Sequence, residues 1–187
     1  ILELAEPRVR SGVWDHTSFR RDPVTRMKRT GFAAMTTVYA PADDARAMIA
    51  TIARAHDRVE GRTPAGVAYR ANDPELLNWV QATASYGFVK AYRRFVRALT
   101  REEIDRFYAE AATGAALFGA HDVPQTAAKT GALFTAMRPK LEPSNIIFDF
   151  LDIVRRAPIL PSRIGQGLMV RAAIDITPSW ACKILNI

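Results

Sequence analysis

The chain has 187 residues, of which 49% are hydrophobic, and a formal net charge of +7. This length allows one domain to form a hydrophobic core without a second domain. The single cysteine, Cys182, excludes a disulfide framework and a cysteine-based metal site. No apolar run approaches the roughly 20 residues of a membrane-spanning helix, and no signal peptide is visible, so we expect a cytoplasmic protein.

The positive charge comes mostly from arginines spread along the whole chain, usually beside carboxylates, as in "REEIDRF" and "DDARAM". This distribution indicates a solvated surface of mixed sign. We expect no nucleic acid partner, because no helix-turn-helix with a basic recognition helix is visible. The excess of arginine would also favour peripheral contact with an anionic membrane. The sequence leaves the oligomeric state open.

In the first half of the chain, the start signals predict two helices and then a loop. Asp22 is the expected N-cap and Pro23 the first residue of a helix over "DPVTRMKRTGFAAMTTVYA". A second helix, "APADDARAMIATIARAHDRVEG", would begin at Pro41 and end at Gly61. "RTPAGVAYRAN" indicates a loop, with a short hairpin as an option. The apolar face of the first helix would contain Val24, Met27, Gly31, Ala34, Met35 and Val38.

A long helix is predicted over "NDPELLNWVQATASYGFVKAYRRFVRAL", with Asp73 as its cap and Pro74 behind it. Thr100 and Glu103 form a capping box that opens a further helix, which would run to Gly119. The residues of the long helix expected to face inward are Leu76, Leu77, Val80, Ala84, Phe88, Tyr92 and Phe95.

The remaining segments, "TAAKTGALFTAMRPKL" and "SNIIFDFLDIVRRAP", predict two more helices, each followed by a proline. From Ser162 onward the pattern indicates one or two shorter helices, broken at Pro178. No segment alternates with the period of two that a half-buried strand requires. The sequence therefore predicts an all-α single domain of about eight helices over residues 1–187.

The stretch "IATIARAHDRVEG" places one of three histidines on an apolar face. If the stretch is one helix, its spacing puts on one stripe Ile49, Ile52, Ala53, His56 and Val59. A histidine in this position is either a hydrogen-bonded core residue or a ligand. The others, His16 and His121, show no paired spacing with it for a zinc site.

A polar cluster on the first helix lies within reach of this histidine. Arg26 and Thr30 are four residues apart and share a face, with Arg29 between them. The short connection "APAD" would send the next helix back antiparallel and bring His56 opposite this region. The cluster is either a convergent site or a buried arginine bonded to carbonyls beside a satisfied core histidine.

Five segments in order along the chain, "GVWDHTSFRRDPVTRMKRT", "HDRVEG", "YRANDPELLNWVQAT", "RFYAE" and "LFGAHDVPQT", resemble the oxygenase MpaB family. This family includes the rubber oxygenase (latex-clearing protein) catalytic domain, and the resemblance is clearest over residues 6–141. It implies an all-helical, globin-like domain that holds a b-type haem. Characterised members use dioxygen to cleave carbon–carbon double bonds in isoprenoid chains.

The resemblance also implies roles for single residues. The family's H-x-x-V-x-G motif falls on His56, which would be the axial ligand of the haem iron. Its R-x-x-x-T motif falls on Arg26 and Thr30, which would be catalytic pocket residues, either polarising bound oxygen or pairing with the haem propionates. We cannot name from the sequence the acceptor that should orient the second ring nitrogen of His56.

A haem is a large apolar disc with two anionic propionates, so its pocket needs apolar and cationic side chains. The expected apolar lining consists of Met27, Ile52 and Val59. Arg29 and Arg54 are further candidates, with Arg26, for the propionates.

At one position the chain departs from the rubber-oxygenase branch. There the residue before the motif threonine is a lysine that can ligate iron, whereas here it is Arg29, a very poor metal ligand. Lys28 is one position off and points about 100° away around a helix. We therefore expect an open or water-bound distal site and a small lipid or terpenoid substrate. The alternative function is a non-catalytic helical domain that binds a hydrophobic ligand or a protein partner without haem.

Overall fold

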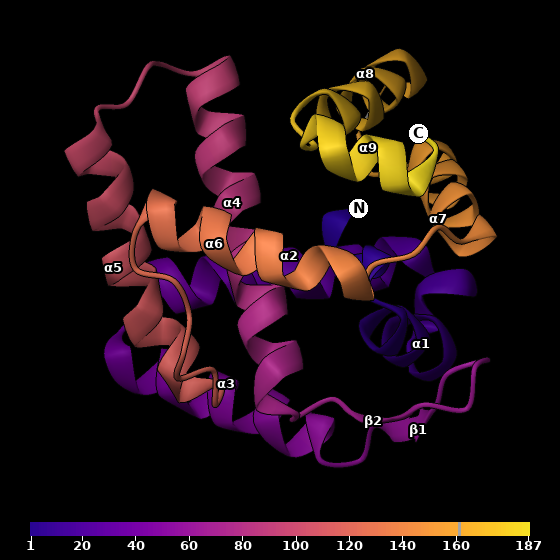
Figure 1. The fold of residues 1–187 in the computed structure, drawn as a ribbon, viewed down its shortest axis with the longest axis horizontal. Helices are drawn as coiled ribbons and strands as arrows, with labels where there is room; N and C mark the ends of the chain where they lie inside the picture. Colours follow the sequence, from indigo (N-terminus) through magenta and orange to yellow (C-terminus); the bar gives the residue numbers. More distant parts are fainter. Residues whose placement is uncertain (161) are drawn as a thin grey trace.

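The computed structural model describes residues 1–160 and 162–187 and is shown in Figure 1. This part of the chain contains nine α-helices, three short 3-10 helices (η1–η3) and one two-stranded sheet, which confirms the predicted all-α class. The first elements are η1 (Leu2–Ala5), α1 (Pro7–His16), η2 (Ser18–Arg20), α2 (Pro23–Tyr39), α3 (Ala42–His56), β1 (Glu60–Arg62) and β2 (Ala68–Arg70). The others are α4 (Pro74–Phe95), α5 (Arg101–Leu117), α6 (Ala127–Met137), η3 (Arg138–Lys140), α7 (Asn145–Arg156), α8 (Arg163–Asp175) and α9 (Ser179–Leu185).

The predicted helix starts are confirmed in atomic detail. The Asp22 side chain accepts a hydrogen bond from the backbone N–H of Thr25 at 3.1 Å, and Asp73 accepts one from Glu75 at 2.9 Å. The capping box of α5 closes in both directions between Thr100 and Glu103. Each of these bonds satisfies an N–H group that has no partner inside its helix.

The second helix is shorter than its apolar spacing predicts. The prediction that it continues to Gly61 is wrong, because α3 ends at His56 and the chain turns into the hairpin. Strands β1 and β2 pair antiparallel with Gly61 opposite Tyr69. The short hairpin that the sequence allowed in this loop is therefore present. Val59 therefore lies beyond the helix, where its side chain packs against the main core.

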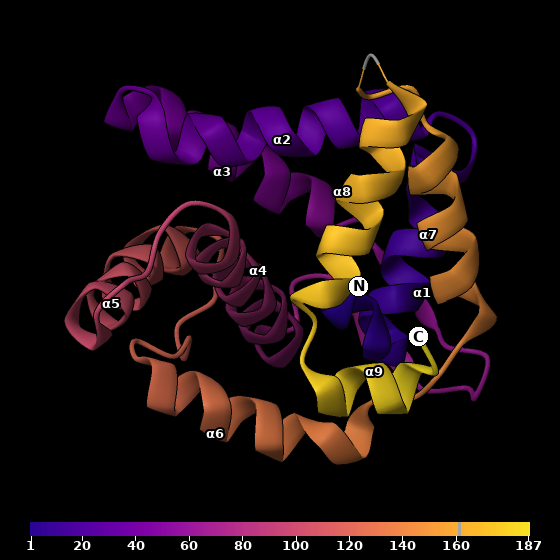
Figure 2. The same cartoon turned by 90° about the horizontal axis from the view of Figure 1, so that it is seen from above.

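The main hydrophobic core joins the two ends of the chain. It lies among η1, α1, the first half of α4, α6, α7 and α9, with Trp79 fully buried near its centre. Figure 2 shows α6 and α9 on one side of α4, while α2 and α3 lie on the other. The fully buried members of this core are Ala5, Trp79, Ile147, Ala181 and Leu185.

Two predicted apolar faces are wrong in part. On α4, Ala84, Phe88, Tyr92 and Phe95 are exposed rather than inward, because the second half of this helix packs on α5 mainly through Val89. On α2 no residue is fully buried, and Gly31, Met35 and Val38 are exposed. Amphipathic spacing identifies the apolar side of a helix, but it does not supply the neighbour that covers that side.

Helices α2 and α3 pack as a pair, and Figure 2 shows them side by side along one edge of the molecule. The connection between them is Ala40 and Pro41, so α3 returns antiparallel as predicted. The start of α2 and the end of α3 therefore lie at the same end of the pair. Among the described helices, none is both long enough and apolar enough to cross a membrane.

Candidate functional site

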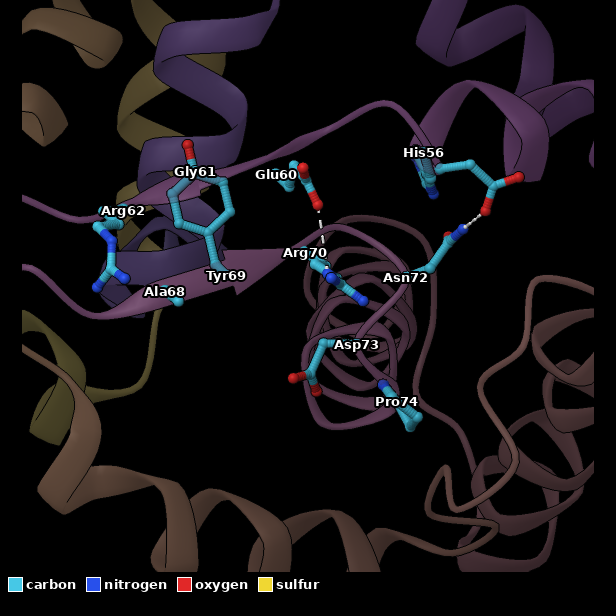
Figure 3. A pocket seen from close by; sticks show the side chains of 11 residues that line it. His56, Glu60, Gly61, Arg62, Ala68, Tyr69, Arg70, Asn72, Asp73 and Pro74 are labelled. Atoms are coloured by element: carbon cyan, nitrogen blue, oxygen red, sulfur yellow. Dashed lines mark hydrogen bonds and ion pairs between the residues drawn. The ribbon is translucent and has the colours of Figure 1, made fainter.

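His56 is the last residue of α3 and is half-buried. Its Nδ1 atom is buried and has no hydrogen-bond partner within the part of the chain that the structure describes. One other buried side-chain atom there shares this property, the Oδ1 of Asn72. Figure 3 shows the Asn72 side chain extending toward the end of α3, where His56 lies. The structure thus brings to this histidine a residue that sequence analysis did not single out.

The surroundings of His56 favour the neutral imidazole. Burial, followed by the positive charge of Arg26, lowers the pKa of His56 below its ordinary value of 6.5, and Asp57 and Asn72 offset only part of this effect. A neutral ring keeps one nitrogen lone pair, which a metal requires of a histidine ligand. The ring is therefore available for ligation near neutral pH.

Arg26 and Thr30 form a bonded pair on α2. The Nη1 group of Arg26 donates to the Thr30 hydroxyl, and that hydroxyl donates to the backbone carbonyl of Arg26 at 2.9 Å. Because the Arg26 charge acts on His56, the pair lies at the end of α2 that faces the histidine. The predicted approach of these helix ends is therefore present, although Thr30 itself is exposed.

Glu3 adds a carboxyl group next to Arg26. Burial raises the pKa of Glu3, and the Arg26 guanidinium offsets part of this rise. The Trp79 indole donates to the Glu3 backbone carbonyl at 3.2 Å, which fixes η1 against α4. Sequence analysis did not select Glu3, because no sequence motif links it with Arg26 and Thr30.

Two surface hollows adjoin these residues. An open hollow of about 1080 Å³ lies between the end of α3, the hairpin and the start of α4, and it includes His56 and Asn72 (Figure 3). Its other side chains are mostly charged or polar. A second hollow of about 410 Å³ lies between α2 and α3 and is mostly apolar. It is lined by Lys28, Arg29, Phe32, Ala33, Met48 and Ile52.

The predicted cofactor-binding residues are distributed over these places. Arg29 and Ile52 share the second hollow, and Lys28 reaches it as well in spite of its different direction around the helix. Met27 is half-buried and lines neither hollow. Val59 packs near Gly12: a Cβ placed at position 12 would lie 3.9 Å from the Val59 side chain. Arg54 is exposed, and its guanidinium donates to the Thr51 hydroxyl at 3.0 Å.

Residues of α2 and α3 offer the kinds of side chain that a haem needs, although His56 and the apolar side chains line different hollows. A haem brings four equatorial nitrogens of its own and needs one axial ligand from the protein, together with apolar contacts and cations. His56 offers a ring whose lowered pKa favours the neutral form. Apolar side chains and the cations Lys28 and Arg29 lie along the same helix pair. No three His, Cys, Asp or Glu side chains converge as a metal site in the described ranges.

A comparison with known protein families gives one match over the whole chain. The family described as "ER-bound oxygenase mpaB/B'/Rubber oxygenase, catalytic domain" matches residues 1–187. No curated protein and no solved structure matches the chain.

Proposed function

The chain belongs to the MpaB/rubber oxygenase catalytic-domain family, and from this premise we propose that it is a haem b-dependent oxygenase acting on a hydrophobic, lipid or isoprenoid-like substrate. The oxygenase class comes from the family. The haem, the substrate class and oxidative cleavage of a carbon–carbon double bond are our proposals for this chain.

The observation that carries the proposal is the state of His56. Its ring is held neutral by burial and by Arg26, at a helix end beside a bonded Arg–Thr pair. The buried Nδ1 atom of His56 has no hydrogen-bond partner among the described residues, which is uncommon for a buried polar group and supports a role beyond packing. A haem bound to Nε2 would supply the dioxygen chemistry.

The other residues would bind and orient. Thr30 fixes the Arg26 guanidinium, so the remaining N–H groups of Arg26 keep a set direction and could donate to an oxygen ligand or a propionate. Lys28 and Arg29 would neutralise propionates at the second hollow. Its apolar side chains, Phe32 and Ile52 among them, would contact the macrocycle or the substrate and exclude water.

We assign a proton-transfer role to Glu3. Its carboxyl group has a raised pKa because burial disfavours the charged form, and it lies close enough to Arg26 for the two charges to interact. A carboxyl group with a raised pKa can accept or release a proton nearer to neutral pH than an exposed one.

Peripheral contact with a membrane would bring such an enzyme to a lipid substrate. The end of α4 and the residues that follow support this part of the proposal, because exposed Phe95 and Val96 lie beside three arginines, Arg93, Arg94 and Arg97. Exposed aromatic and apolar side chains among arginines suit the interface of an anionic bilayer.

The test is oxygen uptake by the haem-reconstituted protein with a polyunsaturated isoprenoid, followed by mass analysis of the products with isotopically labelled dioxygen. We expect labelled aldehyde or ketone ends and uptake well above that of free hemin. Arg26→Leu should reduce the rate by roughly 10-fold or more, because it removes the oriented donor. Arg46→Leu, at an exposed site near the other end of the helix pair, is the matched control. Uptake no faster than free hemin would contradict the proposed activity.

A further inference from the structure

We propose that Asn72 is a positioning residue: its side-chain oxygen accepts a hydrogen bond from Nδ1–H of His56 and so presents Nε2 as the iron-binding nitrogen. This inference rests on the proposed haem function and deepens it by naming the residue that sets the tautomer and direction of the axial ligand.

The hydrogen bonds of the Asn72 amide determine which of its ends faces the histidine. Its Nδ2 group donates to the Asp57 carboxylate at 2.5 Å and to the backbone carbonyl of Ala53 at 3.3 Å. Both partners are acceptors only, so the NH₂ end must face them. The oxygen end is thereby turned away from Asp57 and Ala53, and an inverted amide would place oxygen against oxygen.

The unpaired atoms complement each other. Nδ1 of His56 and Oδ1 of Asn72 are the two buried side-chain atoms in the described ranges that lack a partner, and their side chains are near enough for Asn72 to act on the pKa of His56 (Figure 3). Buried polar groups left unpaired cost free energy. A hydrogen bond from Nδ1–H to this oxygen would satisfy both atoms at once.

The hairpin between α3 and α4 positions Asn72 beside His56. The N–H of Ala71 donates to the carbonyl of Val59 at 2.9 Å, so the backbone just before Asn72 is tied to the segment that follows His56. On its other side, Asp73 caps α4. The backbone on both sides of Asn72 is thus fixed. A small rotation of the His56 ring therefore leaves the position of the Asn72 oxygen unchanged.

The chemical consequence concerns the ligand itself. A proton on Nδ1 leaves the lone pair on Nε2, and a hydrogen bond from Nδ1–H makes Nε2 more basic and fixes the plane of the ring. Without the acceptor, the ring would exchange between both tautomers, and half-buried His56 would ligate iron in a less defined orientation.

The experiment has two arms that use the same chain. In the first, long-range proton–nitrogen NMR of the haem-free protein reports which His56 nitrogen is protonated, in the wild type, in Asn72→Leu and in the control Asn145→Leu. Asn145 is an exposed asparagine at the start of α7. In the second arm, the same proteins are titrated with hemin, and the iron–histidine stretching band of the ferrous form is recorded.

We expect the Nδ1–H tautomer in the wild type and in Asn145→Leu, and a shift to Nε2–H in Asn72→Leu. Haem affinity should fall roughly 10-fold or more in Asn72→Leu, and the iron–histidine band should move to lower frequency. Should Asn72→Leu fail to fold, Asn72→Ala removes the same side-chain oxygen with a smaller change in volume. Asn72→Ala should likewise shift the tautomer to Nε2–H.

The outcomes separate the two proposals. An Nε2–H tautomer in the wild type, or an unchanged Nδ1–H tautomer in a folded variant that lacks the side-chain oxygen at position 72, overturns the role of Asn72 whatever the haem does. A wild type that takes up no haem overturns the proposed function and with it the role of Asn72 toward iron, even if the NMR arm finds the hydrogen bond.

Discussion

Gly61→Ala should destabilise the hairpin that links His56 to Asn72. Gly61 lies opposite Tyr69 in the strand pair, and a Cβ at position 61 would lie 2.8 Å from the Tyr69 hydroxyl oxygen and 3.0 Å from Cζ. Ordinary contact requires about 3.5 Å, so the ring must move by roughly 0.6 Å. Tyr69 is only 6% exposed and its hydroxyl is 3.1 Å from Nε2 of His16, so the ring has little room.

Two destabilising terms and one stabilising term set the change in the free energy of unfolding. Overpacking of a filled site costs about 1–3 kcal/mol, and loss of the His16–Tyr69 hydrogen bond adds about 1 kcal/mol. The lower chain entropy of alanine in the unfolded state returns about 0.5 kcal/mol. With this third term included, we expect Gly61→Ala to lower the free energy of unfolding by about 1.5–3.5 kcal/mol, measured by urea denaturation with circular dichroism.

Gly31→Ala is the matched control, because an added Cβ on exposed α2 meets no atom within 4 Å. In a helix the same change should stabilise the protein by about 0.5–1 kcal/mol. Adding Tyr69→Phe to Gly61→Ala removes the closest contact, so the two changes should couple by about 1 kcal/mol in a double-mutant cycle. A Gly61→Ala protein as stable as Gly31→Ala, or a cycle without coupling, would refute the close-contact argument.

Four further outcomes are expected. Burial and Arg26 hold the folded pKa of His56 below 6.5, so the free energy of unfolding should fall as the pH is lowered through 6.5 toward the folded pKa, and a pH series of urea melts should lack this step in His56→Gln. Arg29→Lys introduces an amine beside the motif threonine and should shift the ferric haem spectrum toward a low-spin form, whereas an unchanged spectrum would contradict an open distal site. Glu3→Gln should slow oxygen uptake by roughly 10-fold or more and flatten its pH profile, and an unaltered profile would remove Glu3 from proton transfer. Thr30→Val should leave stability within about 0.5 kcal/mol, because Thr30 is exposed, but should lower the rate by releasing the Arg26 guanidinium.

Local signals in the sequence predicted the elements well. Asp22 and Asp73 cap their helices, the Thr100–Glu103 capping box forms, and α5 ends at Leu117, shortly before Gly119 with its φ of +92°. Each of these features depends on residues within one helical turn, so the local sequence is enough to predict it. The antiparallel return of α3 followed in the same way from a short connection.

Long-range features escaped prediction for a physical reason. The apolar stripe through Val59 suggested a longer helix, but pairing of β1 with β2 competes for the same backbone groups and ends α3 at His56. Asn72 is 16 positions from His56 along the chain, across the hairpin, and no periodicity connects the two. The exposed Phe88 and Phe95 likewise depend on which neighbour packs on α4, which spacing does not encode.

The most direct test of the account is hemin titration followed by absorption spectroscopy, with His56→Ala beside His121→Ala. His121 is exposed in the loop after α5, so the two variants lose the same chemical group from different surroundings. The account predicts saturation at one haem per chain in the wild type and in His121→Ala. His56→Ala should show a lost or altered Soret band that added imidazole restores. Uptake that is absent in the wild type, or equal in both variants, would contradict the assignment of His56 as the axial ligand.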